Sequence, residues 1–319
     1  MRLALLTTTT TEEALSPELE RFARTAEARG HACAVVRHGE VFVCLDGRAG
    51  DAAAEAPLLT RLPGALIGGP GAEALAAADL VIPKISLRRQ CRGDFYLVEA
   101  LDAAGVRFLQ DLEPLEICRN KVTSLLRLSA RGIPVPPTVV IRRPEHLGAV
   151  PRLLGAPPWV VKPSMGSKGR DVLLARDEAA LRDAVETLWA ADRHDIVLAQ
   201  PFLQPAGAPP WDLRAVVLLG QVVGAMRREA PPGDFRSNFS LGANVAFVEL
   251  ERELEILALD AARALSLKLA GVDILVGRDG PAVLEVNANP GWEGIAGALR
   301  AAGKDFHAAF LQRLEAFYP

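Results

Sequence analysis

Short apolar runs alternate with amphipathic stretches through the first third of the chain. The runs typical of buried strands are Leu3 to Thr7, Val35-Val36, Leu80 to Ile85 and Val106 to Leu109. Ser16-Pro17 supplies an N-cap and a first helical residue, and Gly30 closes that helix. A further helix is expected over residues 94–104. This order of strands and helices predicts a small parallel sheet within residues 1–111.

The middle of the chain, residues 112–198, combines helical and strand patterns. One helix is expected over Pro114 to Ala130, followed by an extended proline-rich linker. The expected strands are Thr138 to Ile141, Trp159 to Lys162 and Val172 to Leu174. A loop from Ser164 to Gly169 joins the last two strands, and its backbone N–H groups are suited to wrap phosphates. Taken alone, such a loop is more often a solvated turn.

The last part of the chain, residues 199–319, predicts two hairpins and two long helices. The expected strands are Leu198 to Leu203, Asp212 to Leu219, Val222 to Arg228, Val272 to Val276 and Ala282 to Val286. Apolar residues three or four apart predict helices over Arg252 to Leu269 and Gly297 to Phe317. A polar run from Gly233 to Asn238 follows the first hairpin. The longer polar stretch from Arg227-Arg228 to Asn238 is either an ordinary surface loop or, from its place before the second hairpin, part of an active-site wall.

The second hairpin predicts a cation site. A three-residue turn, Arg278 to Gly280, with Gly280 in the left-handed conformation, sets Asp273 opposite Glu285. Asn287, two residues further on, shares the face of Glu285. A two-residue turn would send the two carboxylates to opposite faces. Acidic residues within apolar strands are costly to bury unless they are paired or bind a metal, and oxygen ligands suit Mg²⁺. The alternative is an ordinary hairpin that carries a few polar residues.

Composition narrows the class of protein. Of the 319 residues, 50% are hydrophobic and 24% are charged, which predicts a globular protein with more than one domain. The net charge of −3 argues against a general nucleic-acid binder. The five histidines do not cluster, so no zinc site is expected. The cysteines are far apart and predict free thiols in a reducing cytosol; they are Cys33, Cys44, Cys91 and Cys118.

Neither a signal peptide nor a membrane span is expected. Only four apolar residues follow Met1-Arg2 before a run of threonines. The longest apolar run, Ala215 to Met226, contains Gln221 and is too short to cross a bilayer. These features predict a cytoplasmic protein without a membrane partner.

Several motifs follow one another in a specific order. They are Asn120-Lys121, VVKP at Val160 to Pro163, MGSKG at Met165 to Gly169, QPFL at Gln200 to Leu203, DLR at Asp212 to Arg214, GDFRSN at Gly233 to Asn238, GVDI at Gly271 to Ile274 and LEVNANPGWEG at Leu284 to Gly294. In this order and spacing they resemble the ATP-grasp ligases, most closely the RimK-like α-L-glutamate ligase family. The resemblance is strong from Leu112 to Gly294 and generic before that.

The resemblance implies an α/β protein with the ATP-grasp fold, built of α+β subdomains behind a Rossmann-like N-terminal domain. The implied divisions are an N-terminal pre-ATP-grasp domain, a central lid subdomain and a C-terminal catalytic subdomain, at 1–111, 112–198 and 199–319. Relatives of this kind suggest a homodimer or homotetramer.

The resemblance also implies a nucleotide site. Lys121 and Lys162 are expected to contact phosphates from the lid. The backbone of Pro201 and Phe202, with Leu203, is expected to form the adenine hinge. Pro201 lacks an N–H but keeps its carbonyl, and Phe202 N–H is expected to remain a donor. The complete predicted nucleotide-binding set is Lys121, Lys162, Ser164, Gly166, Ser167, Gly169, Gln200, Pro201, Phe202, Leu203, Asp212, Arg236 and Asn238.

Further roles follow from the same resemblance. Asp212 is expected to hold the ribose, and Arg236 and Asn238 are expected to reach the γ-phosphate and the reacting centre. Asp273, Glu285 and Asn287 are expected to hold one or two Mg²⁺, for which Mn²⁺ is a substitute. This set agrees with the site that the hairpin register predicts independently.

The implied chemistry explains these residue types. A carboxylate is a poor electrophile, and transfer of the γ-phosphoryl group of ATP onto it gives an acylphosphate that an amine can attack. The transfer needs cations around the moving phosphoryl group, hence lysine, arginine and Mg²⁺. The acylphosphate hydrolyses in water, so a closing flap is useful, and the MGSKG loop is the candidate.

Three assignments stay open at this stage. Arg214, expected among the catalytic residues with Arg236 and Asn238, either binds a substrate carboxylate or makes a structural ion pair. Lys168 and Arg170 either add charge to the flap or are solvated. Gly68 to Gly71 resembles a dinucleotide loop only loosely and is better explained as a loop before a helix.

The sequence therefore predicts a cytoplasmic, ATP-dependent ligase that joins an amino acid to a carboxylate acceptor. L-Glutamate is the first candidate for the amino acid. The candidate acceptors are a peptide, a protein tail, a carrier and a coenzyme. The enzyme alternative is a D-alanine–D-alanine type ligase, and dipeptide formation from D-alanine would favour it. The alternative of another class is a nucleotide-binding regulatory protein without catalysis, which the intact set of charged residues opposes. An NAD-dependent enzyme would rest on the poor Gly68 loop alone.

Overall fold

The structure is a computed structural model that describes residues 1–8, 13–44, 59–62, 65–85, 95–166, 169, 171–203 and 209–318, and of residues 44, 59–62 and 65–66 it describes the backbone alone. The chain forms two units, each with its own sheets. One unit consists of Met1–Leu115 with Asp305–Pro319, and the other consists of Glu116–Lys304. Helix α4 (Leu112–Arg119) runs across the boundary.

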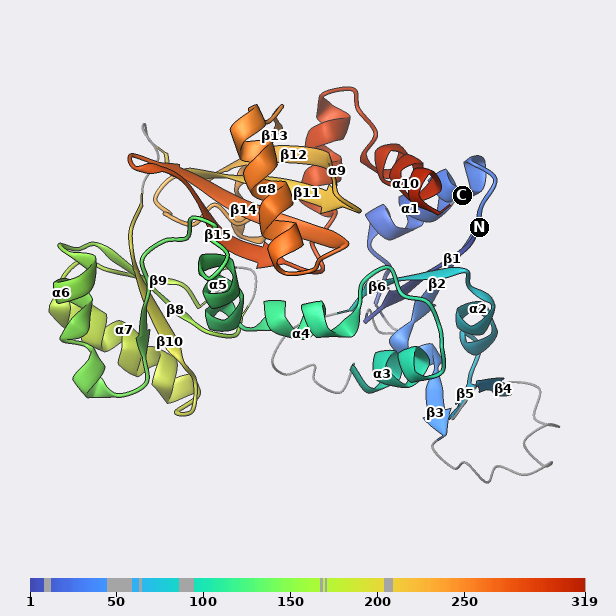
Figure 1. Ribbon diagram of the computed structural model, residues 1–319, viewed down its shortest axis with the longest axis horizontal. Coiled ribbons are helices and arrows are strands. Elements are labelled where there is room, and N and C mark those ends of the chain that lie inside the picture. Colours follow the sequence, from blue (N-terminus) through green and yellow to red (C-terminus); the bar gives the residue numbers. More distant parts are fainter. Residues whose placement is uncertain are drawn as a thin grey trace. The chain divides into compact units, whose positions relative to one another are not determined.

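The first unit contains a three-stranded parallel sheet in the order β2-β1-β6 (Figure 1). Its strands are β1 (Arg2–Thr7), β2 (Ala32–Arg37) and β6 (Leu80–Lys84). This sheet confirms the predicted parallel βαβ arrangement, but the expected last strand is reduced to a single bridge between Val81 and Phe108. A small antiparallel sheet accompanies it, made of β3 (Phe42–Cys44), β5 (Ala65–Gly68) and β4 (Leu59–Leu62). The helices are α1 (Pro17–Ala28), α2 (Ala72–Ala77), α3 (Phe95–Ala103), α10 (Phe306–Phe317) and the short 3-10 helix η1 (His38–Glu40).

The C-terminal helix α10 belongs to the first unit, because it packs on α1. Phe22 and Phe310 meet edge to face with ring centroids 5.6 Å apart. His307 Nε2 lies 2.7 Å from Glu18 Oε2 in the same buried contact. The sequence grouped residues 305–319 with the catalytic subdomain, because an amphipathic helix does not reveal which sheet it covers.

The predicted single helix over Gly297 to Phe317 is wrong. The chain forms α9 (Glu293–Ala301) and α10, with Gly303 at φ +72° between them. The Asp305 carboxylate caps α10 by accepting the N–H groups of His307 and Ala308. A glycine in the left-handed conformation followed by an aspartate N-cap is a stop-and-start signal, and it outweighs the continuous apolar stripe.

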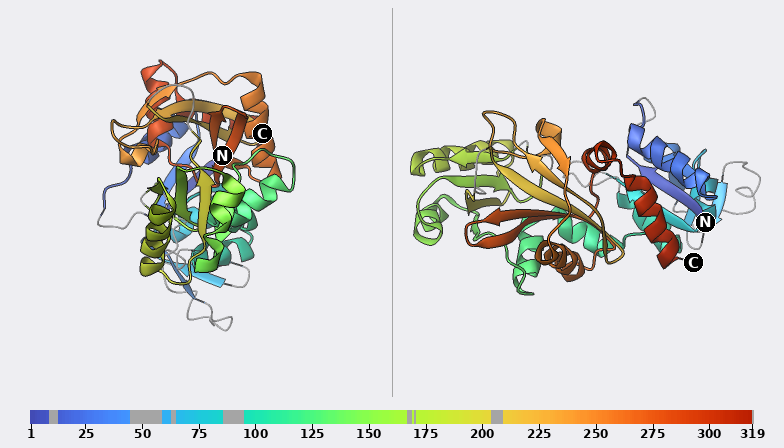
Figure 2. Two further views of the ribbon diagram at one scale, coloured as in Figure 1. Left: turned by 90° about the vertical axis from the view of Figure 1, so that its left-hand side faces the viewer. Right: turned by 90° about the horizontal axis from the view of Figure 1, so that it is seen from above.

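The second unit begins with the lid sheet, four strands in the order β7-β10-β8-β9. The strands are β7 (Val139–Ile141), β10 (Val197–Pro201), β8 (Trp159–Pro163) and β9 (Leu173–Ala175). One face packs on α6 (Ala149–Leu154) and α7 (Glu178–Ala191), with Trp159, Val161 and Ala199 in the shared core (Figures 1 and 2). Because side chains alternate along a strand, the opposite face carries Val160, Lys162 and Gln200. A short 3-10 helix, η4 (Pro144–His146), follows β7.

The catalytic sheet of the second unit has five strands in the order β13-β12-β11-β14-β15 (Figure 1). The strands are β13 (Asn244–Phe247), β12 (Gln221–Glu229), β11 (Trp211–Leu218), β14 (Leu269–Gly277) and β15 (Gly280–Asn287), and all pairs are antiparallel. Helix α8 (Arg252–Ala264) contacts β11, β12, β14 and β15, and α9 contacts β12 and β13. The short 3-10 helix η5 (Phe239–Leu241) precedes β13. Helix α8 ends five residues before the predicted end, at the point where the chain turns into β14.

The β14–β15 hairpin has the predicted pairing but a different turn. Asp273 lies opposite Glu285 and Gly271 lies opposite Asn287, as predicted. The turn, however, has two residues between Gly277 and Gly280, instead of the predicted three. A register shift beside Asp273 adds one residue to β15 and restores the phase. The two carboxylates stay paired because of this bulge, a feature that turn chemistry alone does not reveal.

The predicted helix over Pro114 to Ala130 is also two helices. Helix α4 ends at Arg119, and α5 (Lys121–Ser129) starts after Asn120. The Asn120 Oδ1 atom accepts the N–H groups of Val122 and Thr123 at 2.9 and 3.2 Å. This N-cap interrupts the helix directly before Lys121 and fixes the direction in which α5 leaves the capped turn.

Candidate active site

A pocket lies within the second unit, between the lid sheet and the catalytic sheet. Its walls come from β8 and β10 on one side and from β11, β12, β14 and β15 on the other. The lining residues are Lys121, Pro136, Val160, Lys162, Pro163, Gly166, Gly169, Asp171, Val172, Gln200, Pro201, Phe202, Leu203, Pro210, Trp211, Asp212, Arg228, Phe235, Arg236, Ser237, Asn238, Asp273, Leu275, Leu284 and Glu285.

Lys162 brings a buried cation to the lid side of the pocket. It stands on β8, on the face opposite the lid core, and only 8% of the residue is exposed. Burial lowers the pKa of Lys162 to about 8, and the repulsion of the nearby Lys121 ammonium adds to this, although Glu285 opposes both. In the described part of the chain, Lys162 has no carboxylate within ion-pair distance. An anion entering the pocket would provide the missing counter-charge.

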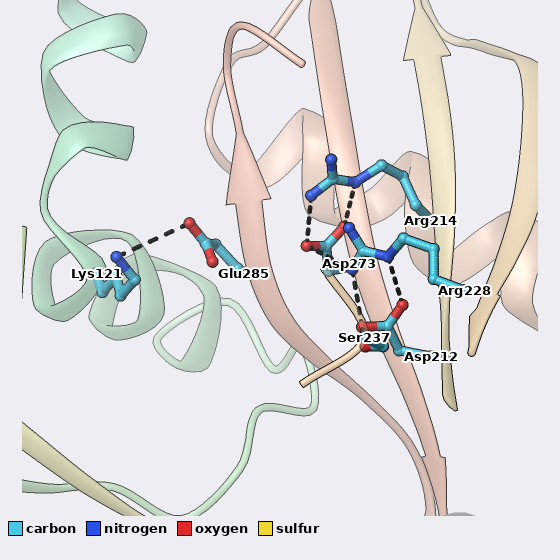
Figure 3. A network of polar contacts seen from close by, with 7 residues as sticks. All are labelled: Lys121, Asp212, Arg214, Arg228, Ser237, Asp273 and Glu285. Carbon is cyan, nitrogen blue, oxygen red and sulfur yellow. Dashed lines mark hydrogen bonds and ion pairs between the residues drawn. The ribbon is translucent and has the colours of Figure 1, made fainter. Parts of the chain in front are cut away.

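Lys121 joins the lid loop to the catalytic sheet. Its Nζ donates to the carbonyl of Gly166 at 2.8 Å and lies 3.9 Å from Glu285 Oε1 (Figure 3). Its backbone N–H donates to Ser164 O at 2.8 Å, which fixes the start of α5 against the end of β8. The lysine is buried and well placed to meet phosphate oxygens between the two sheets.

The hinge strand β10 corrects one predicted donor. Phe202 N–H donates to Pro158 O at 3.0 Å, so it continues the ladder with β8 and is not available to adenine. Successive residues of a strand direct their backbone groups to opposite sides. The carbonyl of Pro201 and the N–H of Leu203 therefore face away from β8. These two groups, and not Phe202 N–H, point away from the β8 ladder, and both residues line the pocket.

Two predicted nucleotide contacts have structural partners. Ser164 is buried, donates through Oγ to Asp195 Oδ1 at 3.1 Å, and does not line the pocket. Gln200 donates through Nε2 to Thr138 Oγ1 at 2.8 Å, so its side chain joins β10 to the segment before β7. Both side chains were predicted to contact the nucleotide, and in this structure each donates a hydrogen bond to a side chain of another segment. Ser167, Lys168 and Arg170 lie outside the described residues.

Asp212 is the centre of a buried polar contact on the catalytic sheet (Figure 3). Arg228 on β12 donates to it twice, from Nε at 2.6 Å and from Nη2 at 2.8 Å. Ser237 Oγ donates to Asp212 Oδ2 at 2.5 Å. Burial raises the pKa of the Asp212 carboxyl, and the Arg228 guanidinium opposes that shift. Both carboxylate oxygens, expected to receive a ribose, are therefore already bonded within the protein.

Asp273 on β14 lies between two arginines. Arg214 donates to it from Nε and Nη2 at 2.6 and 2.7 Å, and Arg228 Nη2 lies 3.0 Å away. Burial alone would raise the pKa of Asp273, but the two guanidinium groups outweigh burial and lower it. Of the two readings left open for Arg214, this structure shows the ion pair. The arginine is on the same strand face as Asp212, two residues away.

The polar run from Gly233 to Asn238 reaches across the pocket to the lid. Asp234 accepts the N–H groups of Phe235 and Arg236 and pairs with the Arg236 side chain; these hydrogen bonds lower the pKa of Asp234 to about 2. Arg236 Nη1 donates to the carbonyl of Gly169 at 3.1 Å. Asn238 packs so closely on Gly169 that a Cβ at this position would collide with Asn238 Oδ1. Residues 235–238 of the run line the pocket, so the run is part of the pocket wall in this structure.

The predicted cation ligands offer oxygen donors of the expected chemistry. The carboxylates of Asp273 and Glu285 are paired across β14 and β15 and line the same pocket. Asn287, one alternation further along β15, has a buried Nδ2 without a partner among the described residues. No cluster of three or more His, Cys, Asp and Glu side chains occurs in the described ranges, and the predicted set has two carboxylates and one amide. Two carboxylates and an amide have the oxygen chemistry of a hard divalent cation site. Both oxygens of Asp273 are paired with Arg214 and Arg228, so Glu285 is the open donor, and Asp273 would have to exchange an arginine contact to bind a metal.

Sequence reasoning did not single out two residues of this site, Arg228 and Ser237. Arg228 is 2% exposed near the end of β12, between Arg227 and Glu229. The rule that identified Asp273 applies equally to it, because a charge in a buried strand requires a partner. Ser237 had no comparable signal.

The geometry can bind a nucleoside triphosphate. An apolar end with a backbone hinge suits a purine, two lysines and an arginine suit phosphates, and paired carboxylates suit a divalent cation. Among the described residues, no cysteine lines this pocket: Cys118 is partly exposed and lies outside the lining residues, and burial raises the pKa of its thiol to about 12.

Residues 118–309 match the family described as RimK-like ATP-grasp domain. The chain belongs to the RimK-like ATP-grasp family. A probable alpha-L-glutamate ligase 2 of Shewanella sp. (strain MR-4) is 31% identical over 318 residues, which cover 99% of this chain and 96% of the relative. A probable alpha-L-glutamate ligase of Xanthomonas euvesicatoria pv. vesicatoria is 38% identical over 239 residues, 74% of this chain and 78% of the relative. The family assignment confirms the resemblance seen in the sequence.

Solved structures confirm the fold of this RimK-like protein. The ATP-grasp ligase PsnB complexed with minimal precursor has a TM-score of 0.69 at 22% identity, with 98% of both chains covered. D-alanine–D-alanine ligase from Bacillus anthracis has a TM-score of 0.65 at 16% identity, covering 99% of this chain and 96% of that one. The protein is an ATP-dependent ligase that joins a carboxylate to an amine and uses a divalent metal. Among the described residues, no helix is long and apolar enough to cross a membrane.

Proposed function

We propose that this RimK-like enzyme adds L-glutamate to a carboxylate acceptor through an acylphosphate, with Mg²⁺ and ATP. The acceptor class is a peptide or protein carboxylate. Two findings support this choice: the relatives with 31% and 38% identity are named probable alpha-L-glutamate ligases, and the solved PsnB structure holds a precursor. The proposal includes a cytoplasmic location and assembly as a homodimer or homotetramer.

The observation that carries the proposal is the convergence of charge in the pocket. Lys121 and Lys162 enter from the lid, and Asp273 and Glu285 enter from the catalytic sheet. The hinge at Pro201 and Leu203 closes the apolar end of the same pocket. A purine nucleotide held at the hinge would extend its phosphates towards the lysines and the two carboxylates.

In the first step, the acceptor carboxylate oxygen attacks the γ-phosphorus of ATP. The bond to the β,γ-bridging oxygen breaks, and ADP keeps that electron pair. Lys121, Lys162 and Arg236 stabilise the negative charge on the transferring group. When bound by Asp273, Glu285 and Asn287, Mg²⁺ supplies further charge neutralisation between the phosphates.

In the second step, the amine of glutamate attacks the acyl carbon and loses a proton. The carbon–oxygen bond to phosphate breaks, inorganic phosphate leaves, and an amide remains. The lid loop limits access of water during this step, because Lys121 holds Gly166 and Arg236 holds Gly169. Asn238 lies beside Gly169 and is placed to contact the reacting group.

The test is a product assay. The enzyme is incubated with ATP, Mg²⁺ and L-glutamate, with and without peptides that end in glutamate, and products are read by mass spectrometry. Addition of glutamate residues with stoichiometric ADP and phosphate is the expected result. Parallel incubations with D-alanine and a panel of other L-amino acids serve as comparison.

Preferential D-alanyl-D-alanine formation would contradict glutamate as the added amino acid. Nucleotide binding without turnover on the whole panel would favour a regulatory role instead. A Glu249→Gln variant is the matched control for substitutions of Glu285, since the Glu249 side chain is 83% exposed and outside the pocket.

A further inference from the structure

One hydrogen bond ties the polar run 233–238 to the catalytic sheet. In the part of the chain that the structure describes, Ser237 is the one side chain of this run that hydrogen-bonds to the sheet. Its hydroxyl donates to Asp212, the first acidic residue of β11 (Figure 3). The neighbours of Ser237 on either side, Arg236 and Asn238, are the residues that contact the lid loop at Gly169.

Asp212 is held rigidly at the other end of this bond. Arg228 donates hydrogen bonds to both carboxylate oxygens of Asp212, and the Nη2 atom of the same guanidinium lies 3.0 Å from Asp273 Oδ2. Arg228 and Asp212 are both buried, with 2% and 6% exposure. A bidentate pair of this kind has one defined geometry, so the position of the Asp212 carboxylate is fixed relative to β12 and β14.

These contacts form a continuous chain from the polar run to the predicted cation ligand. It passes from Ser237 to Asp212, then to Arg228 and finally to Asp273 (Figure 3). The contacts link strands β11, β12 and β14 to the irregular segment 233–238. Among the described residues, the segment 233–238 has no other side-chain hydrogen bond to the sheet. Loss of the Ser237 bond would therefore let Arg236 and Asn238 shift by the small distances that affect transition-state contacts.

We propose that Asp212 and Ser237 are positioning residues: Asp212, locked by Arg228, anchors Ser237 so that Arg236 and Asn238 face the γ-phosphate. This assignment replaces the ribose contact predicted for Asp212. It rests on the proposed function in one respect, the orientation of Arg236 and Asn238 towards the γ-phosphate. Both residues line the pocket, and the role proposed for them is to hold Arg236 and Asn238 in place.

The test compares two nucleotides that differ in the γ-phosphate. Dissociation constants are measured by calorimetry for Mg²⁺ with ADP and with the non-hydrolysable ATP analogue AMPPNP. Ser237→Ala removes the tether and leaves the Asp212–Arg228 pair intact. The preference of wild type for AMPPNP should fall about tenfold in this variant, as expected for loss of properly placed charged contacts. The affinity for ADP should change less than twofold.

Ser237→Thr keeps the hydroxyl and should restore the preference, which a general packing defect would not do. Equal preference in wild type and Ser237→Ala would overturn the tether and leave the proposed nucleotide site standing. Absence of any AMPPNP preference in wild type would overturn both the tether and the γ-phosphate assignment.

A second arm separates anchoring from ribose binding. Asp212→Asn and wild type are compared with ADP, 2′-deoxy-ADP and 3′-deoxy-ADP. If Asp212 anchors Ser237, removing either hydroxyl weakens both proteins by the same factor. If Asp212 held the ribose, removing the contacted hydroxyl would weaken ADP binding to wild type but hardly change binding to Asp212→Asn, and that result would overturn the proposal.

Discussion

The two sheets of the second unit present charge to one pocket in different ways. On the catalytic sheet, Asp212, Arg228, Asp273 and Arg214 pair with one another across β11, β12 and β14 at 2.6–3.0 Å. On the lid side, Lys162 is buried without an ion-pair partner among the described residues, and its pKa falls to about 8.

This difference shows which charges are structural and which await a ligand. A buried pair that is fully bonded is already organised, and it holds the residues around it in one arrangement. A buried lysine without a counter-ion lowers the stability of the unliganded protein and gains most when an anion arrives. We therefore expect the lid to respond to phosphate, while the paired charges of the catalytic sheet act as a fixed frame.

Glu285 gives the largest expected effect, because it is the open carboxylate of the predicted cation set. Glu285→Gln should lower ligase turnover by about a thousandfold through weakened charge neutralisation in the transition state. Thermal unfolding of the variant should stay near that of wild type, because the ion pair of Glu285 with Lys121 is long, at 3.9 Å. Phosphate release measures the first quantity and calorimetry the second, with Glu249→Gln as control. Wild-type turnover in Glu285→Gln would remove Glu285 from the cation site.

The same substitution on the two sheets should have opposite effects on stability. Arg228→Met leaves two buried carboxylates with too little counter-charge and should cost about 3 to 5 kcal/mol of unfolding free energy. Lys162→Met removes an uncompensated charge and should leave the free energy unchanged or raise it. Urea denaturation measures both. Asp260→Asn, which breaks an exposed pair, should cost about 1 kcal/mol or less. Equal losses at Arg228 and Lys162 would erase the distinction between frame and lid.

The pKa of Lys162 predicts how nucleotide affinity depends on pH. The free enzyme loses the Lys162 proton as pH rises through about 8, and phosphate binds the protonated form. Bound phosphate raises the pKa, so binding takes up a proton above pH 8. Metal-free ADP should therefore bind about tenfold more weakly at pH 9 than at pH 7.

The matched control for this titration is Lys162→Arg. Arginine stays charged throughout this range, so the variant should show a flat profile between pH 7 and 9. The same loss of affinity in both proteins would assign the titration to another group.

The hinge gives the smallest expected effect. If the Pro201 carbonyl accepts the adenine amino group, a purine nucleoside diphosphate that lacks this group should bind about fivefold more weakly than ADP, the value of one ordinary hydrogen bond. Competition binding against a fluorescent ADP measures the ratio. Equal binding would show that the hinge does not recognise the amino group.

Sequence reasoning found the elements of the fold and the members of the site better than it found their partners. The motifs located Lys121, Lys162, Glu285 and Asp273, and all four line the pocket. Periodicity identified nearly every strand of the second unit. These successes depend on local information, namely spacing along the chain and the cost of burying charge.

The failures concern information that lies between strands. The pairing of Asp273 with Arg214 requires β11 beside β14, which no local pattern states. Asp212 and Arg228, in contrast, lie opposite each other on the predicted first hairpin, so their pairing was within reach of the sequence. The direction of Phe202 N–H depends on how far the β8 ladder continues. The hairpin register was correct although the predicted turn was not, because the bulge beside Asp273 compensated for the shorter turn. Gly303 and Asp305, in contrast, were readable signals for the break before α10.

The most direct test of the central claim compares ADP with adenosine in wild type and in Lys162→Met. We expect wild type to bind ADP much more tightly than adenosine. This preference should fall by about 10- to 100-fold in Lys162→Met, the effect of losing one charged hydrogen bond to phosphate. Adenosine affinity should be the same in both proteins, since the hinge is unchanged. An undiminished preference for ADP in Lys162→Met would show that the lid lysine does not receive the phosphates.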